Sequence, residues 1–171
     1  PPRERGTKML KLGDQLWTYY PASDRVILIA GHMLRQSVMG SDLSYEDMLE
    51  DPSLSGNHDA RISGEETLLG RPCRVLDLVA RKADAAYPTR RIWVDRERFT
   101  VLKEELLARS GKLLKTTTVD SVRPFRDRWI PDRVRFKDAM NEGRGTEFVI
   151  EEIEFDAMIP ESLFSKAALK K

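Results

Sequence analysis

The sequence contains a single cysteine, Cys73, among 171 residues, so no disulfide can form within the chain. It contains two histidines, His32 and His58, and their spacing matches no metal-binding motif. Long apolar runs are absent as well: the run 26–30 has five residues, whereas a membrane-spanning helix needs about 20. The sequence therefore predicts no disulfide scaffold, no metal site and no membrane-spanning segment.

Neither sign of charge is in excess, because 29 lysines and arginines balance 28 acidic residues to a net charge of +1. A nucleic-acid binder usually carries a basic surplus on one face, and here the pair Arg90-Arg91 is soon followed by Asp95 and Glu97. We therefore expect no nucleic-acid partner. The chain length fits one globular domain, residues 1–171.

Catalytic motifs are also missing. The sequence has no glycine-rich phosphate loop, no nucleophile elbow and no Ser-His-Asp order. Glu104 and Glu105 are adjacent in a predicted strand, so their side chains point to opposite faces and cannot form an acid–base pair. The sequence predicts neither an enzyme nor a cofactor.

The feature that is present throughout is a two-residue alternation of apolar and polar residues in short runs. The predicted strands are residues 7–12, 15–20, 25–30, 58–69, 72–81, 90–95, 99–108, 112–122, 128–139 and 145–156. Tight turns such as Gly13-Asp14 and Ser110-Gly111 join many of them, which favours an antiparallel meander. The prediction is a mainly β fold, with one strongly curved antiparallel sheet of eight to ten strands.

The segment from Gly31 to Gly56 interrupts this pattern. It is rich in large apolar residues without alternation, and Ser44 followed by Glu46 and Asp47 is typical of a helix start. We predict a lid-like insertion, 31–56, with short helical turns. Another helical turn is expected at 160–164, and 166–171 is expected to be a polar tail.

The faces of the predicted strands are uneven. In residues 133–137 one face is basic and the other is apolar. An apolar sheet face must be covered, and little helical material is available, so the sheet either curls on itself or holds a ligand. Both a self-filled barrel and a ligand carrier remain open on this pattern.

Several stretches together resemble the outer-membrane lipoprotein-sorting family, the LolA-like periplasmic carriers. They are residues 5–7 with Leu10, Leu16-Trp17 with Tyr19 and Pro21, 39–47, 93–95, 111–116, and Phe155 with Ile159-Pro160 and 163–165. The stretch from Gly40 to Asp47 is the most distinctive, and the matches follow one another along nearly the whole chain.

The resemblance implies an incomplete, LolA/LolB-like barrel with short helices as a lid over a hydrophobic concave face. It implies lipids or lipid-modified proteins as cargo, transport between the inner and outer membranes, and the periplasm as location. An inner-membrane transporter is a further expected partner. The helix and first strands that open the family's fold are not found in these residues, so we expect that an N-terminal portion and an export signal precede them.

Aromatic and methionine side chains are the candidates for lining a lipid site, because they adapt to irregular apolar cargo. The candidates are Trp17, Tyr19, Met33, Met39, Leu43, Tyr45, Met48 and Trp93. Ordinary core packing is the alternative for each of them.

The densest polar cluster consists of Gly40, Ser41, Asp42, Ser44, Glu46 and Asp47. Carboxylates can bind calcium, but this spacing is not that of an EF-hand loop. Capping of a turn and a helix start is the preferred interpretation, and a metal site or a partner-docking surface are the alternatives. For the whole protein, the alternative to a carrier is an adaptor that docks on a lipid-exporting transporter and holds no lipid.

Overall fold

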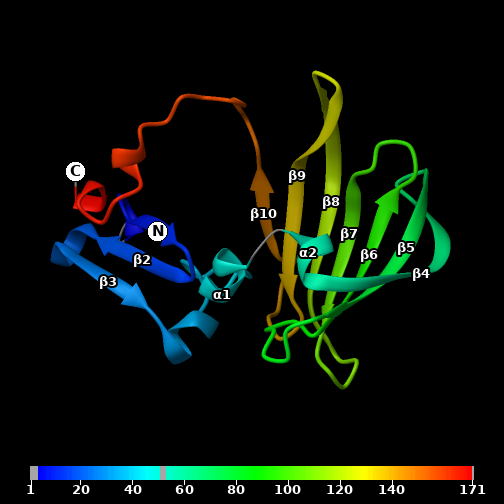
Figure 1. Cartoon of the computed structure of the whole chain (residues 1–171), viewed down its shortest axis with the longest axis horizontal. Coiled ribbons are helices and arrows are strands. Elements are labelled where there is room, and N and C mark those ends of the chain that lie inside the picture. The colour runs from blue at the N-terminus through cyan, green and yellow to red at the C-terminus, as the bar shows by residue number, and fades with distance from the viewer. Residues whose placement is uncertain (1–3, 51–52, 171) are drawn as a thin grey trace. The chain divides into compact units, whose positions relative to one another are not determined.

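The computed structural model describes residues 4–50 and 53–170, which form two compact units. The first unit contains the residues up to Glu50 together with those from Ile153 onward. The second contains the residues between them. Figure 1 labels the α-helices and most of the strands of both units. The second unit is thus one continuous stretch of chain, whereas the first is built from two stretches.

The first unit contains a three-stranded antiparallel sheet in the order β1-β2-β3. Its strands are β1 (Lys8–Leu12), β2 (Gln15–Tyr20) and β3 (Arg25–Ile29). Leu12 pairs with Gln15, so Gly13-Asp14 is the two-residue hairpin turn that the sequence predicts. A short 3-10 helix, η2 (Pro21–Ser23), joins β2 to β3.

The chain after β3 packs on this sheet. It forms the 3-10 helix η3 (Gly31–Arg35) and the helix α1 (Tyr45–Leu49). The core of the unit consists of Leu16, Ile29, Val38 and Tyr45, with Met9, Met33, Leu34 and Leu49 packed against it. The residues of the predicted insertion up to Glu50 therefore bury apolar surface on β2 and β3 of their own unit.

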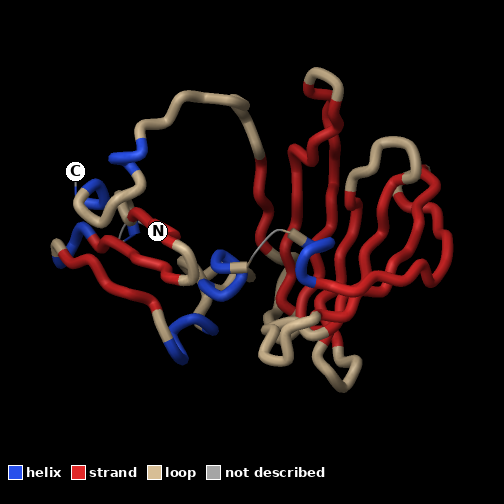
Figure 2. The backbone as a smooth tube through the Cα atoms, in the orientation of Figure 1, coloured by secondary structure: helices blue, strands red, loops and turns tan. Residues whose placement is uncertain are grey.

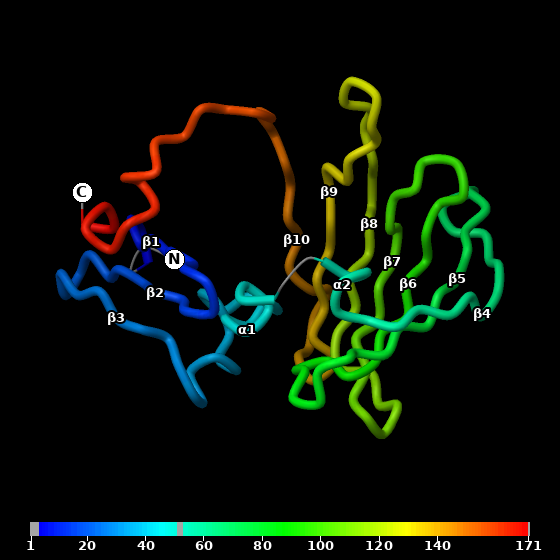
Figure 3. The backbone as a smooth tube through the Cα atoms, in the orientation of Figure 1, coloured from blue at the N-terminus to red at the C-terminus, as the bar shows by residue number. Residues whose placement is uncertain are grey.

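The last residues return to the same unit through the 3-10 helices η4 (Glu161–Leu163) and η5 (Ala168–Lys170). Figure 3 shows this red end of the trace beside β1 and β2. Leu169 is buried, and the Lys170 ammonium lies 3.1 Å from the Asp24 carboxylate. The stretch expected to be a polar tail thus contacts the sheet through an apolar side chain, an ion pair and the Lys166 ammonium, which lies on the Trp17 ring.

The second unit is a seven-stranded antiparallel sheet in which each strand pairs with the next along the chain (Figure 2). Its elements are α2 (Leu54–Asn57), β4 (His58–Leu68), β5 (Arg71–Ala80), β6 (Thr89–Asp95), β7 (Val101–Leu107), β8 (Leu113–Phe125), β9 (Arg128–Asp138) and β10 (Thr146–Val149). The strands β4 and β10 are its two edges, so the sheet stays open.

The seven strands curve instead of lying flat (Figure 1). Register shifts interrupt the pairing between Ile62 and Gly64, between Trp93 and Val94, and between Leu106 and Leu107. Such bulges bend a strand and increase its twist. Near the first two shifts lies the core of this unit, which consists of Cys73, Val75, Trp93, Leu102 and Val119.

The structure confirms a mainly β fold with a strongly curved open sheet and short helices. The expectation of one continuous sheet is wrong, because the ten strands fall into two sheets. The division comes between β3 and β4, where the described residues 30–50 and 53–57 form no strand. The strand predicted at 145–156 is also shorter than expected, since β10 ends at Val149. No helix in the described ranges is long and apolar enough to cross a membrane.

Candidate functional site

One face of the seven-stranded sheet carries a row of charged side chains. Residues paired in register share a face, and the row is Arg61, Asp77, Arg91, Glu105, Thr116 and Lys137. The Asp77 carboxylate accepts a hydrogen bond from the Arg91 guanidinium at 2.7 Å. It also lies 3.5 Å from the Arg61 guanidinium. The Arg91 hydrogen bond holds the pKa of Asp77 below its usual value. We call this side the charged face, and part of the unit's apolar core lies on it as well, since Val75 and Trp93 are two positions along their strands from Asp77 and Arg91.

The other side of the sheet combines apolar and polar residues, and we call it the mixed face. One row across it is Ile62, Leu76, Ile92, Glu104, Thr117 and Phe136, and the next is Leu78, Arg90, Leu106 and Lys115. The apolar side of residues 133–137 does lie on this face, through Phe136. The mixed face as a whole is not apolar, although the sequence pattern of residues 133–137 indicated an apolar face. The strands β6, β7 and β8 each place a charged side chain on it.

The mixed face contains an ion pair between the buried Arg90 and the half-buried Glu104. The Arg90 side chain is 4% exposed, and its Nη1 donates to Glu104 Oε1 at 2.9 Å. The Arg90 guanidinium also lies 5.9 Å from the ring centroid of buried Tyr87. Desolvation offsets most of the attraction in a buried pair, so such a pair adds little net stability. A charged pair among leucines and isoleucines is therefore a candidate contact for a polar group on an apolar ligand.

In the first unit, the stretch Gly40 to Asp47 builds a turn and a helix start. Gly40 has a φ of 74°, and Val38 N–H donates to Leu43 C=O at 2.7 Å across the turn. The Ser44 Oγ accepts from Asp47 N–H at 3.4 Å, while an Asp47 carboxylate oxygen accepts from Ser44 N–H at 2.6 Å. This reciprocal capping box begins α1 at the position that the sequence indicates.

Seven of the eight predicted lipid-lining residues belong to the first unit. Tyr45 is in its core and Met33 packs against that core. Burial and a hydrogen bond with the Tyr20 hydroxyl raise the pKa of Tyr45 to about 12. Trp17 lies under the Lys166 ammonium, 3.4 Å from the ring centroid, and the Tyr19 hydroxyl donates to the Asp24 carboxylate at 3.2 Å.

Met39 and Met48 are 36% and 39% exposed, and Leu43 is half-buried. Met39 and Met48 are the two exposed side chains of the predicted set. Trp93, in the second unit, is 5% exposed, and its indole Nε1 donates to the Glu66 carboxylate at 2.8 Å. It packs in the core of that unit, which satisfies its N–H as buried tryptophans require.

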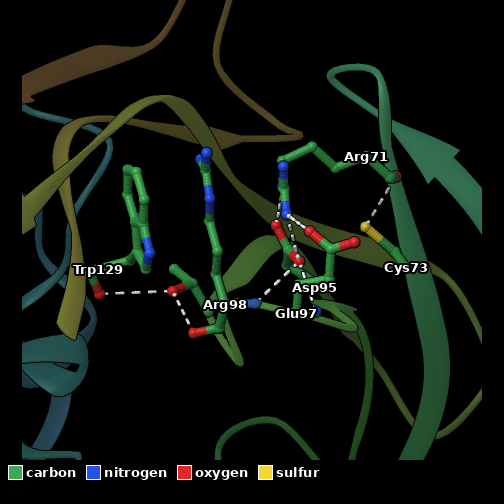
Figure 4. A network of polar contacts seen from close by, with 7 residues as sticks. Arg71, Cys73, Asp95, Glu97, Arg98 and Trp129 are labelled. Atoms are coloured by element: carbon green, nitrogen blue, oxygen red, sulfur yellow. Dashed lines mark hydrogen bonds and ion pairs between the residues drawn. The ribbon is translucent and has the colours of Figure 1, made fainter. Parts of the chain in front are cut away.

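The residue pattern did not single out a polar network at one end of the seven-stranded sheet (Figure 4). The Asp95 carboxylate is fully buried, pairs with the Arg71 guanidinium, and accepts from the N–H groups of Glu97 and Arg98 at 2.9 and 3.1 Å. The Arg71 hydrogen bond is the main reason that the pKa of Asp95 falls to about 2. Asp95 thereby fixes the turn between β6 and β7. The polar network could have been predicted from one signal, an aspartate at the end of a predicted strand and before a charged turn.

The network continues to a neighbouring hairpin. The Arg98 guanidinium stacks 3.5 Å from the ring centroid of Trp129, and the Thr100 hydroxyl donates to Trp129 C=O at 3.4 Å. Among residues 4–50 and 53–170, no cluster of His, Cys, Asp and Glu is arranged to hold a metal ion. The acidic stretch near Asp42 instead provides the caps described above.

The sequence and the fold of the chain are similar to those of several known proteins. A family model described as "Uncharacterized protein" matches residues 1–171. A search of curated proteins found no match. Among solved structures, the chain is similar to an outer membrane lipoprotein-sorting protein domain from Vibrio parahaemolyticus, with 26% identity and a TM-score of 0.85. That match covers 100% of this chain and 74% of the other.

Two further structures share the fold. A DUF1329 family protein from Desulfovibrio piger has 24% identity and a TM-score of 0.82, covering 99% of this chain and 73% of that one. A LolA superfamily protein from Nitrosomonas europaea has 23% identity and a TM-score of 0.76, covering 98% and 74%. The open curved sheet and the smaller unit are thus common to several proteins.

Proposed function

We propose that the protein, whose fold is that of LolA-like, outer-membrane lipoprotein-sorting proteins, is a periplasmic carrier of lipids or of the acyl chains of lipoproteins. The observation that carries the proposal is the match of the entire chain to a lipoprotein-sorting domain at a TM-score of 0.85. The cargo moves between the inner and outer membranes, and a transporter of the inner membrane is the expected donor. The protein performs no catalysis in this role.

The mixed face of the seven-stranded sheet is the side that suits an acyl chain. Leu76, Ile92 and Phe136 provide apolar contact across three strands. The Arg90–Glu104 pair lies among them and offers a charged contact to a headgroup. Apolar pockets with a few polar groups that fix orientation are typical of small-molecule sites.

The segment from Gly31 to Gly56 is the proposed lid. Its methionines Met39 and Met48 are partly exposed and lie outside the core cluster of the first unit, so they are available to an apolar ligand. The other members of the lining set are Trp17, Tyr19, Met33, Leu43, Tyr45 and Trp93. Methionine is unbranched and polarisable, so it accommodates chains of different shape.

Lipid extraction and native mass spectrometry of the purified full chain test the proposal. Co-purified lipid, together with saturable uptake of a fluorescent fatty acid, is the expected result. Phe136→Glu on the mixed face should reduce uptake strongly. Lys137→Glu, the adjacent residue on the charged face, is the matched control and should leave uptake unchanged. Absence of lipid and of uptake in the parent protein would contradict the carrier.

The second candidate is an adaptor that docks on a lipid-exporting transporter without holding lipid. The buried Trp93 favours it, because this aromatic side chain fills the protein's own core and is 5% exposed. A self-filled sheet predicts no co-purified lipid and equal behaviour of the Phe136 and Lys137 variants. The same extraction experiment therefore separates the two candidates.

A further inference from the structure

Three hairpin turns lie together at one end of the seven-stranded sheet, and we call this region the hairpin end. They are the turns of β4–β5, β6–β7 and β8–β9, within residues 68–72, 95–100 and 123–129. Arg96 N–H donates to Pro72 C=O at 3.0 Å, which joins the first turn to the second. The stacking of Arg98 on Trp129 joins the second to the third (Figure 4). The three turns thus form one connected surface.

Two large apolar side chains stand exposed on this surface. Phe99 is 83% exposed and Leu69 is 58% exposed. Both residues have left-handed backbone conformations, with φ values of 53° and 52°. This conformation is unfavourable for bulky residues, and Gly or Asn would adopt it more easily. Each position therefore combines an unfavourable backbone conformation with an apolar side chain that is largely left in water.

Basic residues outnumber acidic ones on these turns, and three of the arginines are in ion pairs: Arg71 with Asp95 and Glu97, Arg96 with Glu65 of β4, and Arg128 with Asp127. The hairpin end contains six arginines and three acidic residues, Asp95, Glu97 and Asp127. Asp95 is fully buried and pairs with Arg71, so it contributes little to the outer surface. Arg98 lies flat on Trp129, next in sequence to Phe99. Apolar side chains within a cationic surface match an anionic lipid headgroup layer above hydrocarbon.

We propose that the hairpin end docks the protein on an anionic phospholipid surface. Phe99 and Leu69 insert between the headgroups, and the arginines lie at the level of the phosphates. Exposed apolar side chains on adjoining hairpin turns, next to arginines, suit a deformable lipid surface better than the fitted pocket of a protein partner. This inference goes beyond the proposed function, because carriage of lipid in solution does not require the protein to touch a bilayer.

Vesicle co-sedimentation with the full chain tests the inference. The protein should bind vesicles of phosphatidylglycerol and phosphatidylethanolamine, bind vesicles of phosphatidylcholine far less, and detach as salt rises. Phe99→Asn and Leu69→Asn suit the left-handed backbone, so both variants should fold. Each should lower partitioning by about tenfold, the effect of removing one buried large apolar side chain from the interface. Arg98→Gln should weaken binding and reduce its dependence on salt.

Met140→Asn is the matched control. Met140 is 73% exposed in the turn between β9 and β10, at the opposite end of the same sheet, and its replacement should not change vesicle binding. Equal binding to neutral vesicles, no binding at all, or equal losses in the Phe99 and Met140 variants would overturn the inference. If the hairpin end instead binds an acidic protein partner, no binding to vesicles is expected.

Uptake of a fluorescent fatty acid in solution without vesicles, measured on the same variants, separates this inference from the carrier proposal. Phe99→Asn should lose vesicle binding and keep uptake. Vesicle binding that depends on Phe99, in a protein without uptake, supports the docking surface while contradicting the carrier. Uptake without any vesicle binding contradicts the docking surface alone.

Discussion

Asp95 is a fully buried carboxylate that is kept ionised by Arg71 and by the N–H groups of the β6–β7 turn. These hydrogen bonds favour its charged form, which is why its pKa is about 2, against an ordinary value of 3.8. The folded state therefore binds the proton of Asp95 more weakly than the unfolded state does. One side chain thus makes this end of the sheet sensitive to acid.

Asp95 should stabilise the fold fully above about pH 4, and this contribution should be lost as the pH falls towards 2. The shift corresponds to about 2 kcal/mol of unfolding free energy. Urea unfolding of the parent and of Asp95→Asn across this range measures it. The variant should be less stable at neutral pH and change less below pH 4. Asp127→Asn, at an exposed position, is the control, and an identical acid response of parent and Asp95→Asn would contradict the assignment.

Ser44 stabilises α1 by capping, since its hydroxyl accepts from Asp47 N–H. Ser44→Ala should lower the unfolding free energy by about 1 kcal/mol, as loss of a helix cap usually does. Ser110→Ala, in an exposed turn, should change it very little. Urea denaturation followed by circular dichroism compares the two. Equal stability of both variants would mean that the cap contributes nothing.

At the scale of elements, the segment from Gly31 to Glu50 has two kinds of apolar residue. Val38 and Tyr45 are buried in the core, whereas Met39 and Met48 are exposed. If the segment is a lid, its exposed residues should contact cargo. Met39 has a φ of 54°, so Met39→Asn relieves backbone strain while removing apolar surface.

We expect Met39→Asn to weaken fatty-acid uptake several-fold while the circular dichroism spectrum stays that of the parent. Fluorescence titration of parent, Met39→Asn and Met140→Asn measures the difference. The Met140 variant removes the same side chain from a turn of the other unit and should bind as the parent does. Uptake that is equal in all three proteins would exclude this segment as the lid.

The returning C-terminal element should hold the small sheet together. Leu169 is 6% exposed, and η5 contacts β1 and β2. Leu169→Ala should therefore cost about 2–3 kcal/mol, the lower part of the range for buried leucines. Hydrogen exchange should become faster in β1 and β2. Leu163→Ala, 59% exposed, should have little effect, and unchanged exchange in the Leu169 variant would contradict the role.

The strands themselves could be predicted from the sequence because alternation and turn residues are local signals. Gln15–Tyr20, for example, begins and ends where the pattern indicates. Alternation does not show whether a partner strand is available. The pattern at 145–156 continues past Val149, but the chain after Ile150 leaves β9 and joins the first unit. The division into two sheets escaped the sequence pattern for the same reason.

The site was less predictable because its important contacts are distant in sequence. Arg71 and Asp95 are 24 positions apart, and Arg90 and Glu104 are 14 apart. The alternation in a strand predicts on which face of the sheet each side chain lies. It does not predict which residue of the next strand lies beside it. The left-handed backbone at Leu69 and Phe99 was equally hidden, since neither residue type is typical of that conformation. Ser44, by contrast, was found because capping depends on residues three positions apart.

At the scale of the whole molecule, the second unit is continuous and the first is not. A fragment of residues 53–152 contains all seven strands of the larger sheet and its core cluster. We expect it to fold alone, with a cooperative urea transition and a β-type circular dichroism spectrum. Full-length protein and the fragment are compared under the same conditions. A fragment without a cooperative transition would mean that the larger sheet depends on the other unit.

The return of the last residues to the first sheet also sets an order of events during protein synthesis. Lys170 contacts Asp24, which lies 146 positions earlier, so this contact cannot form until nearly all the described chain has left the ribosome. The β4–β10 meander needs only neighbouring strands and can form earlier, because contacts between adjacent segments close the shortest loops. The strands β1 to β3 are made first, yet their unit is completed last. In the interval, Leu16 and Ile29 lack part of their final cover, which is the period when a chaperone would be most useful.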